Sequence, residues 1–526
     1  MTNVLTTDNR QIARAAGTVM AAFVLSNLIG LVRQILVSNA FGTSTSIDAY
    51  NAASTYPDLI FSLIAGGALA SAFIPTITNF LAKGDRRNAW FLSSAIANLV
   101  FLSLSFVSLI SAIYAPWIVA NILAPKFSPE QQALTSQLLR ILLIAPAIFG
   151  VSGLLMGILN AHQVFLWPAL APTMYWLGMI FGVLFLSPFM GIYGLAWGAI
   201  MGSILHLGIQ VPALLRLPGR RYYASLGIHF PAVREVGRLM VPRLLGIGAV
   251  QLNFVVNTII ATGQPVGSLT AIKYAWAIMT MPQVVIAQAI AIAALPTFSA
   301  QVARGEYGEM RNSLSATLRG VLLLSIPATF GLIILRAPII SALFERGEFD
   351  AHSTELVAWA LLWYTTGLIG QSVVEIVSRA FYAMHNTLTP VLVSVGAMSL
   401  NIVFSLVFSN LFIRIGWQPH GGLALANSLA TTLEMFALLA LMSRRLKGIN
   451  AGNILQAGWQ TLASTLIMAL GIYLWLLATR NQPAWLIALG GILIGALLFV
   501  GIALLIGNQE IRSIGRELSR RAFGKR

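Results

Sequence analysis

The stretch SNLIGLVRQILVSNAFGTSTSIDAYNAASTYPDLIFSLIAGGALASAFIP, residues 26–75, is almost free of charged side chains, which are limited to Arg33, Asp48 and Asp58. A membrane-spanning helix needs about 20 consecutive, mostly apolar residues. Two such helices fit in and around this stretch, one ending near residue 39 and the next beginning near residue 48. The stretch therefore predicts a pair of membrane helices joined by a short polar turn.

The rest of the chain has the same character. Of its 526 residues, 57% are hydrophobic and 9% are charged, whereas soluble proteins carry about 25% charged residues. This composition excludes a series of soluble domains and predicts an all-α polytopic membrane protein. The chain has no cysteine, which excludes a disulfide framework and thiolate metal sites. Its six histidines are never spaced i,i+3 or i,i+4, so no helical metal site is expected.

Apolar segments of spanning length predict about fourteen transmembrane helices. They fall at about 13–39, 48–82, 90–114, 134–161, 166–189, 191–215, 238–262, 268–302, 314–336, 354–384, 388–413, 421–443, 455–478 and 483–507. Prolines and a glycine pair interrupt the second and eighth of them, a pattern typical of kinked or broken helices beside a polar cavity. The residues concerned are Pro57, Gly66, Gly67, Pro75, Pro282 and Pro296.

Basic residues are distributed unevenly over the predicted loops. If the N-terminus is cytoplasmic, 24 of the 32 lysines and arginines lie on the cytoplasmic side, 5 lie outside and 3 lie within helices. The positive-inside rule therefore predicts that both termini are cytoplasmic. Because this distribution accounts for the net charge of +16, a nucleic-acid partner is not expected.

Three pairs of similar segments indicate an internal repeat with an offset of 222 to 228 residues. The pairs are APWIVANILAPKFS from Ala115 with APIISALFERGEFD from Ala337, AHQVFLWP from Ala161 with AMHNTLTP from Ala383, and GLAWG at Gly194 with GLALA at Gly422. Six helices per half is an even number, so the predicted pseudo-two-fold axis runs along the membrane normal. The two lobes suggest alternating access, and the alternative is a duplicated scaffold without transport.

The repeat divides the chain into five predicted parts. They are an N-terminal lobe of helices 1–6 over residues 1–215, a basic cytoplasmic linker over 216–237, a C-terminal lobe of helices 7–12 over 238–447, helices 13 and 14 over 448–508, and a basic cytoplasmic tail over 509–526.

Charged side chains at membrane depth cost about 2.5–3.5 kcal/mol each on insertion scales, so each requires a reason. Arg33 in the first helix and Lys273 in the eighth are candidates for an anion site, since both suit a phosphate or pyrophosphate. The alternative is that each cation pairs with a buried carboxylate such as Glu375 or Glu434. Those two acids are in turn candidates for binding a coupling cation or proton.

Three motifs carry a resemblance to a known family. Residues 26–75, LFERGEFDAHST from Leu343 and RAFYAMHNTLTP from Arg379 resemble motifs of the MurJ/MviN lipid II flippases, members of the multidrug/oligosaccharidyl-lipid/polysaccharide exporter superfamily. The similarity covers all fourteen predicted helices. Arg33 matches the family's helix 1 arginine, and Asp48 in SIDAY matches an acidic residue at the outer start of helix 2, which makes Asp48 a further substrate-binding candidate.

The resemblance implies a flippase in peptidoglycan biosynthesis and no enzymatic activity. Its substrate would be undecaprenyl-pyrophosphate-linked peptidoglycan precursor, lipid II, carried from the inner to the outer leaflet of the bacterial cytoplasmic membrane. Membrane lipids and cell wall synthesis proteins are the expected partners. No cofactor is expected, and the membrane potential or a monovalent cation would supply the drive. An exporter of another lipid-linked oligosaccharide or amphiphile is the alternative, and the absence of clustered aspartates argues against a polyprenyl-phosphate glycosyltransferase.

Overall fold

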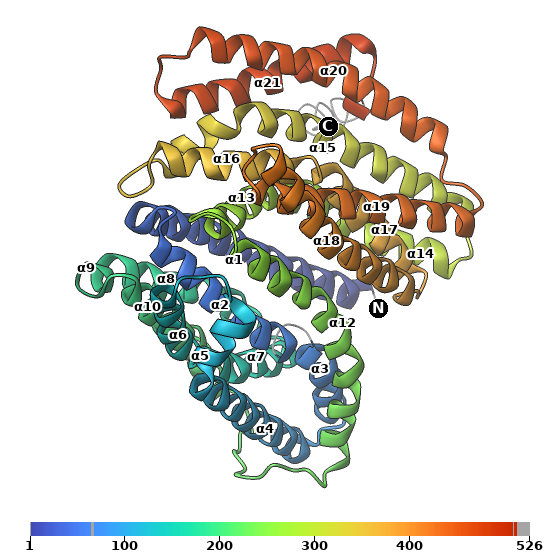
Figure 1. Ribbon diagram of the computed structural model, residues 1–526. Helices are drawn as coiled ribbons and strands as arrows, with labels where there is room; N and C mark the ends of the chain where they lie inside the picture. Colours follow the sequence, from blue (N-terminus) through green and yellow to red (C-terminus); the bar gives the residue numbers. More distant parts are fainter. Residues whose placement is uncertain (1, 65–67, 509, 513–526) are drawn as a thin grey trace. The chain divides into compact units, whose positions relative to one another are not determined.

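In the computed structural model, every regular element of the described residues, 2–64, 68–508 and 510–512, is a helix (Figure 1). A helix lies at each of the fourteen predicted positions. Within the described residues, 11 helices are long and apolar enough to cross a membrane, or up to 12 if one bent pair counts as a single span. The prediction of an all-α polytopic membrane protein is therefore confirmed, and the chain is a multi-pass membrane protein.

The helices fall into two compact units, each described by itself. The first comprises residues 1–266 together with Arg346–Glu348. Its helices are α1 (Thr2–Phe41), α2 (Thr45–Ile64), α3 (Ala68–Ala82), α4 (Arg86–Ile113), α5 (Ala115–Ile118), η1 (Val119–Leu123), α6 (Pro129–Leu142), α7 (Ala145–Ala161), α8 (Leu166–Phe181), η2 (Gly182–Leu186), α9 (Ser187–Met190), α10 (Ile192–Gly208), α11 (Val211–Leu215) and α12 (Pro231–Ala261).

The second unit comprises residues 267–345 and 349–526. Its helices are α13 (Ser268–Gln283), η3 (Val284–Gln288), α14 (Ala289–Ala303), α15 (Tyr307–Phe344), α16 (Ala351–Thr365), α17 (Leu368–Ala383), α18 (Leu388–Arg414), α19 (His420–Leu446), α20 (Ala451–Ala478) and α21 (Ala484–Ile506). The sequence pattern divides the lobes at the linker 216–237, whereas packing groups α12 with the first unit, because α12 contacts α2 and α3. Of the predicted tail 509–526, only 510–512 lie within the described residues.

One of the four predicted prolines lies beside a helix interruption. Pro57, Pro75 and Pro296 lie inside the α-helices α2, α3 and α14. The second predicted helix consists of α2 and α3, and the Gly66–Gly67 pair between them lies outside the described residues. In the eighth, the α-helix gives way to the π-helical turn η3 two residues after Pro282 and resumes as α14. Proline lacks a backbone N–H, so it cannot complete the α-helical ladder, and a wider turn relieves the strain. The α16–α17 pair bends by 46° at residues 366–367.

The repeat seen in the sequence reappears in the way two helices end. Gln163 after α7 and His385 after α17 have φ angles of 60° and 55°, which are unusual for residues other than glycine. The amide of each donates to the carbonyl three residues earlier at 3.0 Å, and the next amide donates to the carbonyl five residues earlier at 2.9 and 3.0 Å. The matched segments at Ala161 and Ala383 therefore build the same left-handed helix cap.

Close packing by glycines joins α8, η2 and α10 in the first unit. A Cβ added to Gly178 would lie 2.2 Å from the Cα of Gly202, and one added to Gly198 would lie 2.7 Å from the Cα of Gly182. Small residues four apart let helix backbones approach closely in a membrane. This packing fixes α8, which carries aromatic side chains toward α1.

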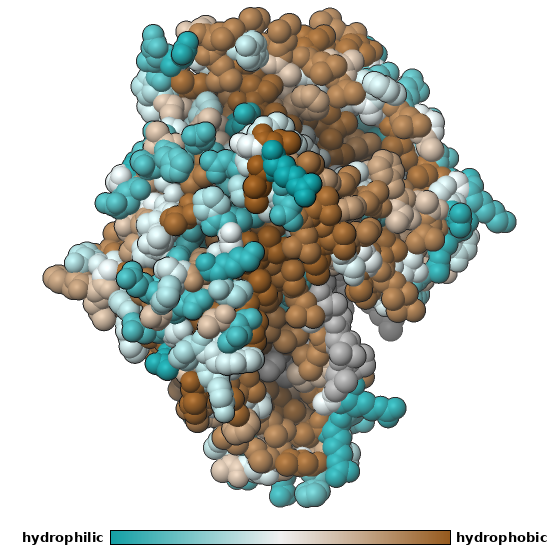
Figure 2. All heavy atoms as spheres, in the orientation of Figure 1, coloured by the Kyte–Doolittle hydropathy of each residue, from teal (hydrophilic) through white to brown (hydrophobic). Residues whose placement is uncertain are grey.

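Large hydrophobic side chains are exposed on both units, including Phe106, Phe189, Leu497 and Leu505. Figure 2 shows hydrophobic residues over much of one face of the molecule. Lipid tails are apolar, as these exposed side chains are, so hydrophobic surfaces are expected on helices that face a bilayer. Each unit also has an internal apolar core, formed around Phe73 and Leu104 in the first and around Phe298 and Phe381 in the second.

Candidate functional site

Arg33 of α1 lies beside an aromatic ring of α8. Its Cζ is 4.7 Å from the centroid of the Trp176 ring, which is cation–π distance. The Arg33 side chain is half-buried, and its Nε is fully buried without a hydrogen-bond partner. Among the described residues of the first unit, no carboxylate forms an ion pair with Arg33. Pairing of Arg33 with Glu375 or Glu434, which lie in the second unit, stays a prediction.

Two tyrosines and one aspartate complete the surroundings of Arg33. Tyr50 of α2 is 7% exposed, Tyr175 of α8 is half-buried, and Asp58 of α2 is exposed. The charges of both Arg33 and Asp58 act on the hydroxyl groups of Tyr50 and Tyr175. These side chains therefore form one polar and aromatic cluster within the first unit.

The cluster continues into a row of rings. The Tyr175 ring lies 4.9 Å from the Trp176 ring and 5.1 Å from the Phe149 ring, and Phe149 lies 4.9 Å from Phe61. Phe149 also lies 5.2 Å from His206. Aromatic contacts of this kind restrict the rotamers of the rings involved. The row therefore limits the movement of the rings that contact Trp176.

A buried polar network lies behind Phe149. Ser152 Oγ is 2.7 Å from His206 Nδ1, and Gln210 Nε2 donates to Ser152 Oγ at 2.7 Å. Gln210 Nε2 also donates to the carbonyl of His206 at 2.9 Å. Ser152 and Gln210 are completely buried, so these bonds satisfy groups that water cannot reach. The network joins α7 to α10 and supports the aromatic row.

Asp48 lies in the first turn of α2, where a negative charge suits the positive end of the helix dipole. Its side chain is 2% exposed and has interaction partners of its own. Contact between Asp48 and a substrate stays a prediction.

Lys273 lies on α13 in the second unit and is half-buried. It too has interaction partners of its own. The predicted partnership of Lys273 with Arg33 concerns two separate units and stays a prediction.

The two predicted coupling acids form a second cluster, in the second unit. Glu375 Oε1 accepts from Arg379 Nη2 at 2.7 Å, one helical turn away on α17. Glu434 of α19 is 6% exposed and accepts a hydrogen bond from Ser394 of α18. The charges of Glu375, Arg379 and Glu434 all act on Tyr382. The acids therefore lie in one neighbourhood, while ion coupling by them stays a prediction.

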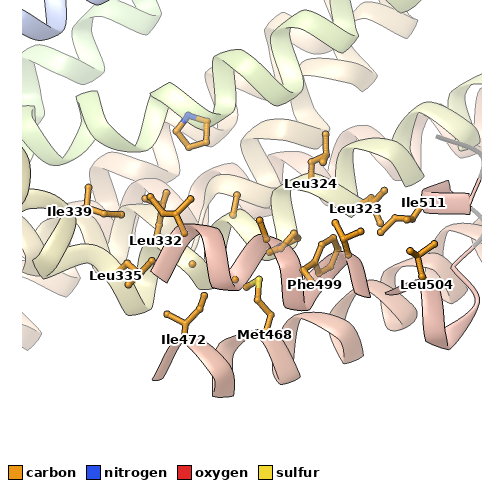
Figure 3. Close-up of a pocket in the computed structure, with 18 residues that line it drawn as sticks. Leu323, Leu324, Leu332, Leu335, Ile339, Met468, Ile472, Phe499, Leu504 and Ile511 are labelled. Atoms are coloured by element: carbon orange, nitrogen blue, oxygen red, sulfur yellow. The ribbon is translucent and has the colours of Figure 1, made fainter. Parts of the chain in front are cut away.

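An apolar cavity of about 750 Å³ lies within the second unit. Figure 3 shows labelled side chains of α15, α20 and α21, among them Leu332, Leu335, Ile472 and Phe499, around it. Small residues on α15 and α21 leave the space that larger side chains would fill, and Pro282 of α13 borders it. These small residues are Ala328, Gly331, Gly495 and Ala496. Sequence reasoning did not predict this cavity, because small residues in apolar helices are equally typical of tight packing.

Trp176, Tyr50 and Tyr175 were also not predicted as site residues. The position of a tryptophan in an apolar helix does not indicate which helix it will contact. Only the packing of α8 against α1 brings Trp176 to Arg33.

Comparisons with known proteins agree with this architecture. A family model described as lipid II flippase MurJ matches residues 37–492. The lipid II flippase MurJ of Burkholderia cenocepacia is 29% identical over 473 residues, which cover 88% of this chain and 89% of that protein. The probable lipid II flippase MurJ of Bdellovibrio bacteriovorus is 27% identical over 522 residues, which cover 97% of each chain.

Solved structures give the same result. One described as lipid II flippase MurJ in an inward closed conformation superimposes with a TM-score of 0.79 at 26% identity, covering 93% of this chain and 98% of that chain. An inward-facing multidrug resistance transporter of the MATE family superimposes with a TM-score of 0.65 at 16% identity, which shows a shared fold alone. Because the family model covers most of its length, the chain belongs to the lipid II flippase MurJ family.

Proposed function

We propose that this protein is a transporter that moves lipid II from the inner to the outer leaflet of the bacterial cytoplasmic membrane by alternating access, in peptidoglycan biosynthesis. The observation that carries the proposal is the family match over residues 37–492. Relatives matched over most of their length are named for the same substrate. The features described above supply groups suited to both ends of such a molecule.

The pyrophosphate of lipid II needs a cation at membrane depth. Arg33 supplies a guanidinium that forms no ion pair with a described residue of the first unit. A guanidinium binds phosphate oxygens through two parallel hydrogen bonds, which fix orientation as well as charge. We assign Arg33 the first contact with the pyrophosphate, Lys273 a second cationic contact, and Asp48 a polar contact near the outer end of α2.

The undecaprenyl chain of lipid II is a hydrocarbon, and it needs an apolar surface. The cavity between α15, α20 and α21 is lined by apolar side chains and has a volume of about 750 Å³. Lipid tails and these side chains are equally apolar, so a hydrocarbon chain can pass from the bilayer into this cavity without a loss of favourable surroundings. The two C-terminal helices, which lie outside the internal repeat, would thus serve the lipid tail.

The drive for export is proposed to be the membrane potential. An anionic head group that moves outward from an inside-negative compartment gains about 2.3 kcal/mol per charge per 100 mV. A monovalent cation bound near Glu375 and Glu434 is the second source. An imposed potential of either sign that left the translocation rate unchanged would exclude the first source and direct attention to the two acids.

The decisive experiment measures translocation of labelled lipid II by the purified protein in lipid vesicles. Wild-type protein should move lipid II, and Arg33→Ala or Lys273→Ala should lower the rate when inserted in equal amounts. Arg33→Lys should fall between wild type and Arg33→Ala, because the charge remains while the planar fork is lost. If lipid II stayed in place while another lipid-linked oligosaccharide moved, the substrate assignment would be wrong and the exporter alternative correct.

A further inference from the structure

Arg33 of α1 lies over the indole ring of Trp176, which belongs to α8. The guanidinium carbon is 4.7 Å from the ring centroid. The π face of an aromatic ring attracts a cation through its quadrupole, whereas an anion binds the N–H donors of a guanidinium.

A carboxylate partner would have the opposite effect. An acid would bind the N–H donors in the plane and neutralise the charge, so a second anion would have to displace it. Among the described residues of the first unit, no acid forms an ion pair with Arg33. Nε of Arg33 is buried, so the terminal N–H groups are the donors that would bind an anionic ligand, while the contact with Trp176 stabilises the cation.

Gly30 allows this close approach. It lies one helical turn before Arg33 on α1, and residues three apart share a helix face. A Cβ built on Gly30 would lie 3.3 Å from Trp176 Nε1 and 3.5 Å from its Cε2. A larger residue at position 30 would push the indole away from α1, and the ring would leave its position beneath the guanidinium.

The aromatic row also contacts the indole. The Tyr175 ring lies 4.9 Å from the Trp176 ring, and the Phe149 ring lies 5.1 Å from the Tyr175 ring. The half-buried indole therefore contacts Gly30 and Arg33 of α1 and the Tyr175 ring.

We propose that Trp176 is a positioning residue that holds the Arg33 guanidinium through a cation–π contact, with Gly30 providing the room, so that the terminal N–H donors of Arg33 can bind the pyrophosphate group of an isoprenyl pyrophosphate. This inference rests on the proposed function, since it names the residue that prepares Arg33 for the head group. Trp176 does not itself bind the phosphate oxygens.

The test is a double-mutant cycle on the full-length protein, purified in detergent, with farnesyl pyrophosphate as the probe and calorimetry as the measurement. Trp176→Leu should weaken binding by about 5- to 30-fold, and Trp176→Phe by less, because phenylalanine keeps a π face. In the Arg33→Ala background, Trp176→Leu should cause no further loss. The matched control is Trp197→Leu, because Trp197 lies on α10 of the same unit and is 39% exposed; it should bind like wild type.

Two outcomes would overturn the inference. One is wild-type affinity in Trp176→Leu, and the other is an equal loss from Trp176→Leu with and without Arg33, which would indicate a general packing role. Trp176→Phe, which keeps an aromatic ring although a smaller one, keeps the test informative if the leucine variant unfolds at a lower temperature. Lipid II translocation is measured separately, so wild-type protein that binds the probe through this pair but moves no lipid II would refute the proposed function and leave the positioning role intact.

Discussion

Asp350 shows how one side chain of the LFERGEFDAHST motif acts on structure. Its Oδ1 accepts from the Ser353 amide at 2.8 Å and caps the N-terminus of α16. This hydrogen bond from the Ser353 backbone is the main reason that the pKa of the Asp350 carboxyl is lowered from 3.8. The ionised form is favoured in the folded protein, so the cap contributes stability above pH 3.8 and loses it as the pH falls through the lowered pKa.

We therefore expect Asp350→Ala to lower the free energy of unfolding by about 1 kcal/mol at pH 7. Asp350→Asn should cost little at pH 7, because asparagine caps helices about as well. Because asparagine does not titrate, the asparagine variant should lose less stability than wild type as the pH falls to 3. Unfolding midpoints in detergent between pH 7 and pH 3 measure both effects, and identical acid sensitivity in wild type and Asp350→Asn would contradict this assignment.

A second expectation at this scale concerns Lys273. Ala277 stands one turn further along α13, and both side chains are half-buried. Residues four apart share a helix face, so a cation moved from 273 to 277 remains on the same wall. Lys273→Ala should lower lipid II translocation, and Lys273→Ala with Ala277→Arg should recover part of it. If Lys273→Ala translocated lipid II at the wild-type rate when inserted in equal amounts, Lys273 would not be part of the substrate site.

Among the elements, the contact of α8 with α10 depends on glycines that admit no side chain. A Cβ on Gly198 would lie 2.7 Å from a backbone Cα, which cannot move aside as a flexible side chain can. Gly198→Ala should therefore destabilise the protein by about 1–3 kcal/mol and loosen the support of Trp176. Gly208→Ala is the matched control on the same helix, since nothing lies within 4 Å of its added Cβ. Equal unfolding midpoints for Gly198→Ala and Gly208→Ala would contradict the expectation that close packing of α8 on α10 stabilises the protein.

The two halves of the internal repeat share the same local structure at only some of their matched positions. Gly194 and Gly422 match in sequence, and at both an added Cβ would meet backbone atoms of the preceding helical segment, at 2.3 and 2.6 Å. The segments at Ala115 and Ala337 match too, yet Ala115 begins the short helix α5 while Ala337 lies inside α15. At Gly194 and Gly422 the same close packing requires glycine. The segments at Ala115 and Ala337 are similar in sequence, but they do not begin their helices at the same position.

For the whole molecule, the uneven distribution of basic residues predicts cytoplasmic termini, and labelling can test this orientation. The chain has no cysteine, and Ala224 in the linker and Ala351 at the start of α16 are both exposed. Single cysteines at these positions should react differently with an impermeant thiol reagent on intact cells. Only Ala351→Cys should be labelled, and both should react after lysis. Labelling of Ala224→Cys on intact cells would reverse the orientation and the direction of transport assigned to it.

The sequence by itself determined the class and the helix positions, showed the repeat and marked Arg33 as a candidate, because the length of an apolar run and the cost of an intramembrane charge are properties of the chain alone. Pro282 likewise predicted an interruption of the eighth helix, where η3 lies, whereas Pro57, Pro75 and Pro296 lie inside α-helices. Only the tertiary structure decided that Trp176 lies against Arg33, that α12 packs with α2 and α3, and that α15, α20 and α21 enclose an apolar cavity. Each of these depends on which faces of distant helices meet, and apolar helices in a membrane have little polarity pattern to indicate their faces.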